Sequence, residues 1–334
     1  MKGISVIICC YNSGNKLIPT LTHLAKQKIS DDINVEIILV DNNCTDNTIE
    51  IALHTWVNLK TPFPLTVAVE TMPGLNYARM KGASGASYEY IIMCDDDNWL
   101  CEDYLSGIYK LFEAMPGVAL IGGVGEAVSD VQLPKWFYDV KGFGYAVGNE
   151  GRKTGFVDSV YGAGMAFRKP VFLSLTENNY SFILSDRKGK SLSSGGDAEI
   201  SILIENAGYK IYLDTALTFK HFLNKERLQW NYYLNLRRSF GKANALLQLH
   251  KEDIANNSQE RKNKIRHFFS LVKFGAIHAK YLLFPGSTKN EACAGFAQEM
   301  SRRINILKEN KIKAGHTVPQ LPVGKNAFIH ADTH

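Results

Sequence analysis

The fold of this chain is decided by residues 90–99, which read YIIMCDDDNW. A short apolar strand runs there directly into three carboxylates, Asp95, Asp96 and Asp97. Neighbouring carboxylates at the mouth of a buried strand repel one another unless a cation or fixed hydrogen-bond donors compensate them. Alternate side chains of an extended segment point the same way, so Asp95 and Asp97 can converge on one ligand while Asp96 faces elsewhere. Oxygen ligands of this kind suit Mg²⁺ or Mn²⁺.

A second interpretation of the three aspartates is structural. Asp is a preferred N-cap residue, so the triplet can also be an Asp-rich turn that caps a helix beginning near residues 99–104. Other segments of the chain bear on the choice between these interpretations, because a binding site draws polar groups from several segments at once.

Three other apolar runs precede this strand, and a helical pattern follows each of them. They lie at residues 4–10, 35–40 and 65–69. Unbroken apolar strands alternating with helices indicate an α/β fold with a parallel sheet covered on both faces. Polar clusters follow the ends of these runs, at residues 11–12, 41–42 and 76–79. Ligands bind beyond the carboxyl ends of such strands, so the sequence predicts a binding site at this rim.

Several function classes lack their sequence signals. No Gly-x-Gly-x-x-Gly turn follows the first strand, which disfavours a dehydrogenase, and no phosphate-binding Lys loop is present. The glycines of the run 122–125 favour a tight backbone approach over a phosphate cradle. The apolar N-terminal segment is short and lacks a basic lead and a cleavage site, so it reads as a strand.

Composition and cysteine usage are those of an ordinary globular chain. The 334 residues are 45% hydrophobic and 21% charged, which suits one large domain or two small ones. The six cysteines show no paired metal spacing, and reduced thiols in a cytoplasm fit them best.

Charge is unevenly distributed along the chain. From Phe222 to the C-terminus there are 19 Lys/Arg and 8 Asp/Glu, a net charge of +11, whereas the preceding 221 residues carry −6. We expect helices at 228–250, 261–284 and 290–309 in this basic part. Segment 261–310 is a candidate for binding an anionic membrane surface. The alternative is a solvated helix bundle packed on the catalytic domain or on a second subunit in a homodimer.

Six ordered motifs make residues 3–222 resemble a family 2 glycosyltransferase, which has the GT-A fold. They are SVIICCYN at 5–12, DNNCTDNT at 41–48, GLNYAR at 74–79, the Asp triplet at 95–97, GGDAEI at 195–200 and His221. The chain departs from the family pattern at Gly196, where Glu is expected. That departure lowers the expectation for contacts that support the neighbouring Asp197.

The resemblance implies a role for most of these residues. The nucleotide sugar would be bound by Cys10, Tyr11, Asn12, Asp41, Asn76, Arg79, Asp95 and Asp96. Within this set, Asp95 would meet the ribose. Asp97 and His221 would hold a divalent metal, Mn²⁺ or Mg²⁺, and Asp197 would be the general base. Taken without the resemblance, Asp197 is a helix cap and His221 is a strand-end residue.

The acceptor site is expected between the fourth strand and Asp197, where aromatic residues stand beside small ones. Its candidate residues are Trp136, Tyr161, Gly162, Ala163, Gly164, Met165 and Glu199. Aromatic faces suit sugar rings, although a core strand at 162–167 is an equally good interpretation of Met165.

These observations predict a metal-dependent, inverting glycosyltransferase of bacterial type. It would move a sugar from a nucleotide diphosphate, first of all UDP, to a hydroxyl of a glycan or polyprenyl-linked acceptor in surface polysaccharide synthesis. Alternatives are an inactive binding or scaffold protein of the same fold and a sugar-nucleotide pyrophosphorylase. Nucleic acid is not an expected partner. The location would be cytoplasmic or peripheral on the inner face of the plasma membrane.

The predicted domain organisation has three parts. Residues 1–222 form the GT-A catalytic domain, with a Rossmann-like nucleotide-sugar half at 1–100 and an acceptor half at 101–222. A basic helical region follows at 223–315, and a loosely ordered tail at 316–334.

Overall fold

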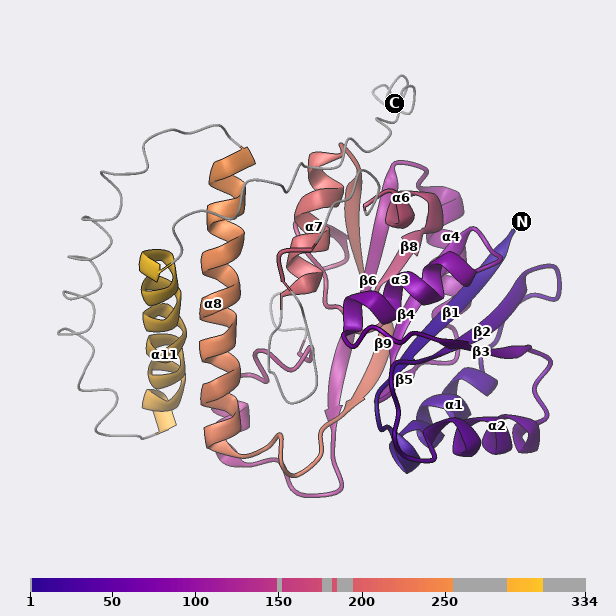
Figure 1. The fold of residues 1–334 in the computed structure, drawn as a ribbon, viewed down its shortest axis with the longest axis horizontal. Coiled ribbons are helices and arrows are strands. Elements are labelled where there is room, and N and C mark those ends of the chain that lie inside the picture. The colour runs from indigo at the N-terminus through magenta and orange to yellow at the C-terminus, as the bar shows by residue number, and fades with distance from the viewer. Residues whose placement is uncertain (1, 149–151, 176–181, 185–194, 255–286, 309–334) are drawn as a thin grey trace.

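The computed structural model describes residues 2–148, 152–175, 182–184, 195–254 and 287–308. A twisted sheet with helices on both faces forms the main body, and a pair of long helices lies beside it (Figure 1). Among the described residues, no helix is both long and apolar enough to cross a lipid bilayer.

All nine strands of the described residues belong to one sheet. They are β1 (Gly3–Cys10), β2 (Asn34–Asp41), β3 (Leu65–Val69), β4 (Tyr90–Asp95), β5 (Asn98–Leu100), β6 (Val118–Val128), β7 (Gly155–Phe156), β8 (Ala166–Arg168) and β9 (Lys210–Phe222). Their order is β3-β2-β1-β4-β8-β6-β9-β5, and β7 pairs with β9.

The first four strands, in the order β3-β2-β1-β4, are parallel, as the sequence predicts. Beyond β4 the sheet is mixed, because β8 runs antiparallel to both β4 and β6 while β6 and β9 are parallel. The α/β fold with a mostly parallel first half is thus confirmed.

Alternation along the strands decides which helices cover which face. Ile4, Val6 and Ile8 of β1 are buried in one core cluster and Ile7 in another, because successive side chains point to opposite faces. The first cluster is covered by α1 (Leu17–Ala25), α2 (Thr48–Leu59) and α4 (Tyr104–Ala114). The second is covered by α3 (Leu75–Gly85), α6 (Lys169–Ser174) and α7 (Gly196–Asn206).

The Asp triplet does not cap a helix. β4 ends at Asp95, a two-residue turn follows, and the short strand β5 begins at Asn98. α4 begins later, at Tyr104, and its N-cap Asp103 makes no side-chain capping bond. β5 pairs antiparallel with β9 so that Asn98 lies opposite His221. The turn therefore brings the Asp triplet next to the end of β9.

The glycine run in β6 allows close backbone contact, as predicted. A Cβ atom added at Gly123 would lie 2.1 Å from the carbonyl oxygen of Leu217, and one at Gly125 would lie 2.1 Å from that of Ala146. Side chains at these positions would push the neighbouring backbone away from β6.

The long helices α8 (Trp230–Ile254) and α11 (Ser287–Lys308) pack side by side (Figure 1). They approach closely at Gly241, where a Cβ would lie 2.0 Å from the carbonyl oxygen of Gln298. An apolar cluster joins them to α5 (Lys135–Asp139), and it includes Phe137, Tyr233 and Ala294. The first and third helices predicted in the basic region are confirmed, whereas the second, at 261–284, and the tail at 316–334 lie outside the described residues.

Candidate active site

A cavity of about 1270 Å³ opens at the carboxyl ends of β1 and β4. Its lining includes the Asp triplet, segments 140–148 and 159–163, and residues from the start of α7. The C-terminal helices complete it with Tyr232, Phe240, Ala243, Asn244, Glu291 and Gln298. Its volume exceeds the range of about 300 to 1,000 Å³ typical of small-ligand pockets, so it has room for two ligands.

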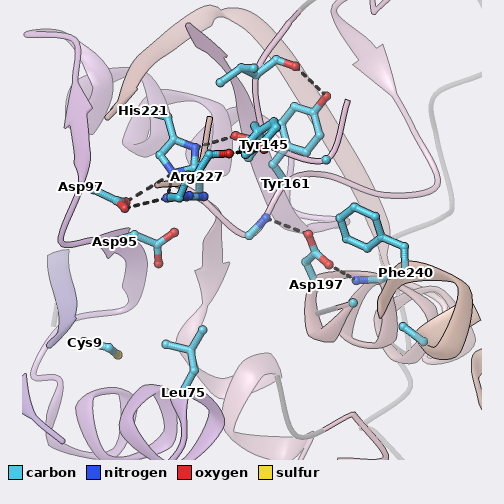
Figure 2. Close-up of a pocket in the computed structure, with 18 of the residues that line it drawn as sticks. Cys9, Leu75, Asp95, Asp97, Tyr145, Tyr161, Asp197, His221, Arg227 and Phe240 are labelled. Carbon is cyan, nitrogen blue, oxygen red and sulfur yellow. Dashed lines mark hydrogen bonds and ion pairs between the residues drawn. The ribbon is translucent and has the colours of Figure 1, made fainter. Parts of the chain in front are cut away.

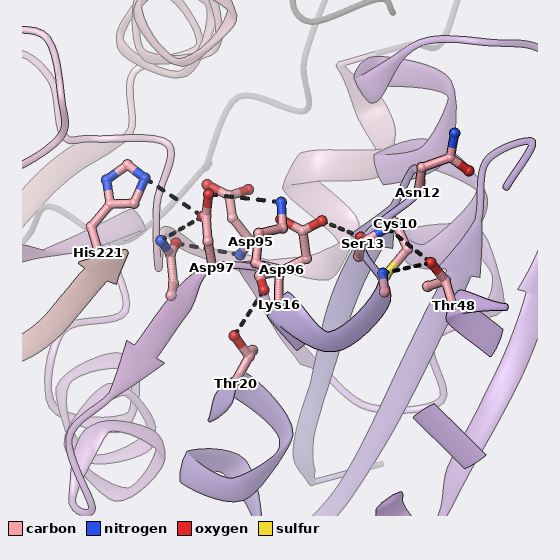
Figure 3. A network of polar contacts seen from close by, with 12 residues as sticks. Cys10, Asn12, Ser13, Lys16, Thr20, Thr48, Asp95, Asp96, Asp97 and His221 are labelled. Carbon is pink, nitrogen blue, oxygen red and sulfur yellow. Dashed lines mark hydrogen bonds and ion pairs between the residues drawn. The ribbon is translucent and has the colours of Figure 1, made fainter. Parts of the chain in front are cut away.

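Asp96 faces away from its two neighbours, as the alternation of the extended segment predicts. Its carboxylate pairs with the ammonium group of Lys16 at 2.8 Å and accepts a hydrogen bond from the Ser13 hydroxyl (Figure 3). Its backbone oxygen accepts a further bond from Thr20 Oγ1 at 3.0 Å. These contacts join the triplet to the 3-10 turn (Gly14–Lys16) and to α1.

The carboxylate of Asp97 faces both His221 and Arg227 (Figure 2). Its Oδ1 is 3.5 Å from His221 Nε2, and its Oδ2 accepts a hydrogen bond from Arg227 Nη1 at 3.1 Å. The ammonium group of Lys16 is 4.0 Å from the same carboxylate. The structure thus brings together the two residues that were predicted to bind the metal, and it adds an arginine to them.

The orientation of His221 is fixed by backbone. Its Nδ1 lies 2.6 Å from the carbonyl oxygen of Tyr145, and a carbonyl only accepts, so Nδ1 carries a proton. Nε2 lies 3.1 Å from Arg227 Nη1, which only donates, so Nε2 must accept there. In this tautomer the Nε2 lone pair of His221 accepts from Arg227.

Burial and neighbouring charges act in opposite directions on the aspartates. Burial raises the pKa of the Asp95 carboxyl to about 6 in spite of the opposing charge of Arg79. Burial alone would also raise the pKa of Asp97, but the positive charges of Arg227 and Lys16 outweigh it and hold that pKa well below its usual range. Asp97 is thus the member of the triplet whose anionic form the surroundings favour most clearly.

The Asp97 and His221 pair fits a divalent cation by ligand type. A carboxylate oxygen and an imidazole lone pair are ligands that Mn²⁺ accepts, and the two atoms converge. Among the described residues, no group of three or more His, Cys, Asp or Glu side chains could hold a metal ion. An ion bound at the pair would therefore take its other ligands from water and from a diphosphate, the usual arrangement for Mg²⁺ bound with nucleotides.

Cysteine thiols near the site are poor metal ligands. Burial raises the pKa of Cys9 to about 12, and it also raises the pKa of Cys10 well above its ordinary value. Metal binding needs a thiolate, so both side chains stay protonated at neutral pH. Cys10 does line the cavity, as does Tyr11, whose ring is exposed.

Other residues predicted to bind the nucleotide shape the turns around the cavity. Asp41 accepts a hydrogen bond from the Cys44 amide at 2.8 Å, and Asn12 accepts one from the Thr45 amide at 2.7 Å. Asn76 donates to the carbonyl oxygen of Leu184 at 2.9 Å. These three residues are not among those that line the cavity, whereas the buried Arg79 is.

Asp197 lies in the first turn of α7 and lines the same cavity as Asp97 (Figure 2). Its Oδ2 accepts a hydrogen bond from the Gly162 amide at 3.1 Å, and its Oδ1 accepts one from the Ala198 amide at 2.9 Å. The second bond fits a residue near a helix N-terminus, while the first orients the carboxylate toward segment 159–163.

The candidate acceptor residues fall into two groups. Tyr161, Gly162 and Ala163 line the cavity. The other four are not among the lining residues. Trp136 stacks on Tyr233 in the aromatic cluster under α8, and Met165 is fully buried in the sheet core. Tyr104 donates a hydrogen bond to the Gly164 carbonyl oxygen. Glu199 is fully buried and accepts bonds from the amides of residues 183 and 184.

Sequence reasoning missed Arg227, Lys16 and the α8 side of the cavity. No motif marks Arg227, which lies in a turn six residues after His221. Lys16 follows the first polar cluster, and its charge is the only sequence signal that could have suggested a partner for the triplet. The wall formed by α8 depends on how a distant helix packs.

Comparison with known proteins identifies the family of this chain. The profile described as Glycosyl transferase family 2 matches residues 5–173, more than half of the chain. The chain belongs to glycosyl transferase family 2. The order of its strands gives the α/β fold class expected from the sequence.

Curated relatives match part of the family 2 region. Glycosyltransferase GlyG of Streptococcus pneumoniae serotype 4 is 31% identical over 119 residues, which cover 36% of this chain and 38% of GlyG. The cholesterol galactosyltransferase of Borreliella burgdorferi is 34% identical over 111 residues, 33% of this chain and 29% of the relative. The aligned part of this glycosyltransferase thus spans less than two-fifths of either relative.

Among solved structures, S. aureus TarS 1-349 in complex with UDP is similar to this family 2 chain. Sequence identity is 15%, coverage is 92% of this chain and 90% of the TarS chain, and the TM-score is 0.47.

Proposed function

We propose that this glycosyltransferase is a metal-dependent, inverting enzyme that moves a sugar from a nucleoside diphosphate to an acceptor hydroxyl. The observation that carries the proposal is one cavity lined both by the Asp97 and His221 pair and by Asp197. A transferase of this kind needs a cation for the departing diphosphate and a base for the attacking hydroxyl.

The nucleotide would lie at the rim formed by β1, β2 and β4. Asp95 is proposed to meet the ribose, and Arg79 the diphosphate, since both line the cavity. The exposed Asn43 and Thr45 offer hydrogen-bond partners there for a base, whereas the buried Asn42 is engaged with the backbone of residues 70, 72 and 74. Asp41 and Asn12 would act by holding the turns that carry these groups.

Asp97 and His221 would hold Mn²⁺ or Mg²⁺, which neutralises the charge that develops on the leaving diphosphate. Asp197 would accept the proton of the acceptor hydroxyl as it attacks the anomeric carbon. Attack from the face opposite the diphosphate inverts that carbon.

The acceptor would enter beside segment 159–163 and α8. Tyr161 and Phe240 supply aromatic surface there, and Arg152 lies 4.0 Å from the centre of the Tyr161 ring. We propose a glycan or polyprenyl-linked acceptor of surface polysaccharide synthesis. Poly-beta-1,6-N-acetyl-D-glucosamine synthase of Staphylococcus epidermidis, 28% identical over 123 residues, is a relative whose name fits that role.

A panel of nucleotide sugars tests the proposal. A ligand that binds only the native state raises its stability with ligand concentration, so we expect one UDP-sugar to raise the unfolding temperature in the presence of Mn²⁺. EDTA should remove most of that rise. The binder is then incubated with glycan and lipid-linked acceptors, and the anomeric configuration of the product is read by NMR. A panel without any binder would contradict the proposal.

The alternative is an inactive protein that keeps the fold and binds a nucleotide. Gly196 favours it, because the family pattern has Glu at this position. Turnover of any nucleotide sugar excludes this alternative, whereas binding without turnover over the whole acceptor panel would support it.

Attachment to a membrane is a separate part of the proposal. The chain from Phe222 onward carries a net charge of +11, and residues 261–310 contain 10 of the 19 Lys and Arg residues of that part. We propose that this segment binds anionic lipid on the inner face of the plasma membrane. Co-sedimentation with vesicles of anionic lipid should decrease when 261–310 is deleted, and unchanged co-sedimentation would contradict it.

A further inference from the structure

The cation position between Asp97 and His221 is held by Arg227. Its Nη1 lies 3.1 Å from Asp97 Oδ2 and 3.1 Å from His221 Nε2. A metal ion bound to these two side chains would need the same carboxylate and the same lone pair. Because the guanidinium uses both, it cannot stay in this position when the metal binds.

The charges around the triplet explain why a guanidinium is stable there. Three carboxylates, Asp95, Asp96 and Asp97, face three cationic side chains, Lys16, Arg79 and Arg227. The site is therefore balanced before any ligand binds. A diphosphate adds negative charge that the three side chains do not compensate, and a divalent ion entering with it would restore the balance.

Arg227 also has unused capacity for hydrogen bonds. Its Nε is buried and has no partner among the described residues. Its backbone is held firmly, since its amide donates to Asn224 and its carbonyl oxygen accepts from the Tyr145 hydroxyl at 2.6 Å. The side chain can therefore change rotamer while the backbone keeps its position. A guanidinium group can donate two parallel hydrogen bonds to two oxygens of a phosphate.

We propose that Arg227 holds the metal position while no nucleotide is bound, and that it transfers to the diphosphate when a metal–nucleotide complex enters. This inference rests on the proposed function. Arg227 thereby excludes free metal from the site and becomes a ligand of the leaving group. The two roles predict effects of opposite sign when its charge is removed.

Two binding measurements on the full chain test this. Free Mn²⁺ is followed by electron paramagnetic resonance, first with Mn²⁺ alone and then with Mn²⁺ and inorganic pyrophosphate, a probe that needs no base recognition. Arg227→Gln should bind Mn²⁺ alone at least about tenfold more tightly than wild type, because a competing charge is gone. It should bind the manganese–pyrophosphate complex at least about tenfold more weakly, because a charged hydrogen-bonding partner is lost.

Three further variants make the result specific. Arg238→Gln, an exposed arginine on α8 that bonds Asn235, should change neither affinity. The double variant Asp97→Asn with Arg227→Gln should lose the gain in Mn²⁺ affinity. Arg227→Lys keeps the positive charge but loses the bidentate hydrogen bonding of the guanidinium. Mn²⁺ alone should therefore bind as in wild type, while the manganese–pyrophosphate complex should bind more weakly. If Arg227→Gln does not fold, Arg227→Lys still tests whether the guanidinium group contributes to pyrophosphate binding.

The inference would be overturned if Arg227→Gln bound Mn²⁺ alone no more tightly than wild type does. It would also be overturned if Arg227→Lys gained as much affinity for Mn²⁺ alone as Arg227→Gln does. Weakening of both affinities would mark Arg227 as merely structural and would overturn it too. Failure of the proposed function gives a different result, since no nucleotide sugar would then bind or turn over in wild type, whatever the Mn²⁺ measurements show.

Discussion

Asp96 and Asp197 carry the same carboxylate group but differ in the residues that contact it, and we expect their roles to differ accordingly. Asp96 is turned toward Lys16 and Ser13, so its hydrogen-bonding capacity is used within the protein. Asp197 lines the same cavity as Asp96, but the contacts that orient its carboxylate are hydrogen bonds from two backbone amides. We therefore expect substitution of the first to affect stability and substitution of the second to affect turnover.

Asp197→Asn should abolish transfer, with turnover reduced by about 10² to 10⁴, because a general base contributes that much. The amide keeps the size of the side chain and can still accept from the Gly162 amide. Nucleotide affinity, measured by calorimetry with Mn²⁺, should stay within about threefold, a range that corresponds to less than about 0.7 kcal/mol. Wild-type turnover in this variant would end the assignment of Asp197 as the base.

Asp96→Asn should lower the free energy of unfolding by about 1 to 2 kcal/mol, because Lys16 loses a partly buried partner. Urea denaturation measures the change. The matched control is Asp31→Asn, an exposed residue, which should be neutral. An Asp96→Asn variant as stable as wild type that no longer binds nucleotide would instead make Asp96 a direct nucleotide ligand.

The pairing of α8 with α11 depends on one position without a side chain. Gly241 lies where a Cβ would be 2.0 Å from the Gln298 carbonyl oxygen, so any larger residue must separate the helices. Both helices contribute residues to the cavity wall, and α8 is tied to α5 through the aromatic cluster. Separation of this pair would therefore change the part of the cavity that we propose to bind the acceptor.

Gly241→Ala should destabilise the chain by about 1 to 3 kcal/mol through overpacking. Gly295→Ala on α11 is the matched control, because an added Cβ there meets only the end of Arg237, at 3.9 Å. It should be stabilising by up to about 1 kcal/mol, since Ala is the better helix former. Thermal denaturation of both variants measures the difference, and equal stabilities would contradict the close approach.

The sheet and its covering helices share one cavity with the C-terminal helices α8 and α11, so acceptor recognition is expected to depend on both parts. Phe240 of α8 is half-buried beside Phe143 and lines the cavity with Tyr161 and Asp197. A donor site at the rim of β1, β2 and β4 would not use this ring. Donor and acceptor are therefore expected to contact different residues, so that a substitution can change the affinity for one without changing that for the other.

Phe240→Ala should raise the acceptor KM by about tenfold while leaving the donor affinity unchanged, because an aromatic surface for the acceptor is lost. Tyr138→Ala is the control, an exposed ring on α5 that is not among the cavity-lining residues, and it should change neither value. Steady-state kinetics with each substrate varied in turn measures both. A loss of donor affinity in Phe240→Ala would contradict this division.

Much of this molecule could be predicted from sequence, and the rest could not for physical reasons. The first four strands are unbroken apolar runs, so their pairing into a parallel half follows from pattern alone. β5 has three residues, too few for a periodic signal, yet its register brings Asp97 beside His221. Arg227 belongs to no motif, and its place depends on a turn held by Tyr145, which is distant in sequence. Such contacts arise only when the whole sheet has formed.

The carbonyl group of Tyr145 that orients His221 is main chain, and this has a consequence for evolution. Any amino acid at position 145 carries the same carbonyl, so a substitution there can remove the hydroxyl contact with Arg227 but not the atom that holds the imidazole. Mutations can therefore affect the hydrogen bond between His221 and this carbonyl oxygen only if they change the backbone conformation of residues 142–148. Homologues can therefore keep the same imidazole geometry with a different residue at position 145, so any preference for Tyr there reflects its buried ring and its hydroxyl contact with Arg227, and not the carbonyl contact with His221.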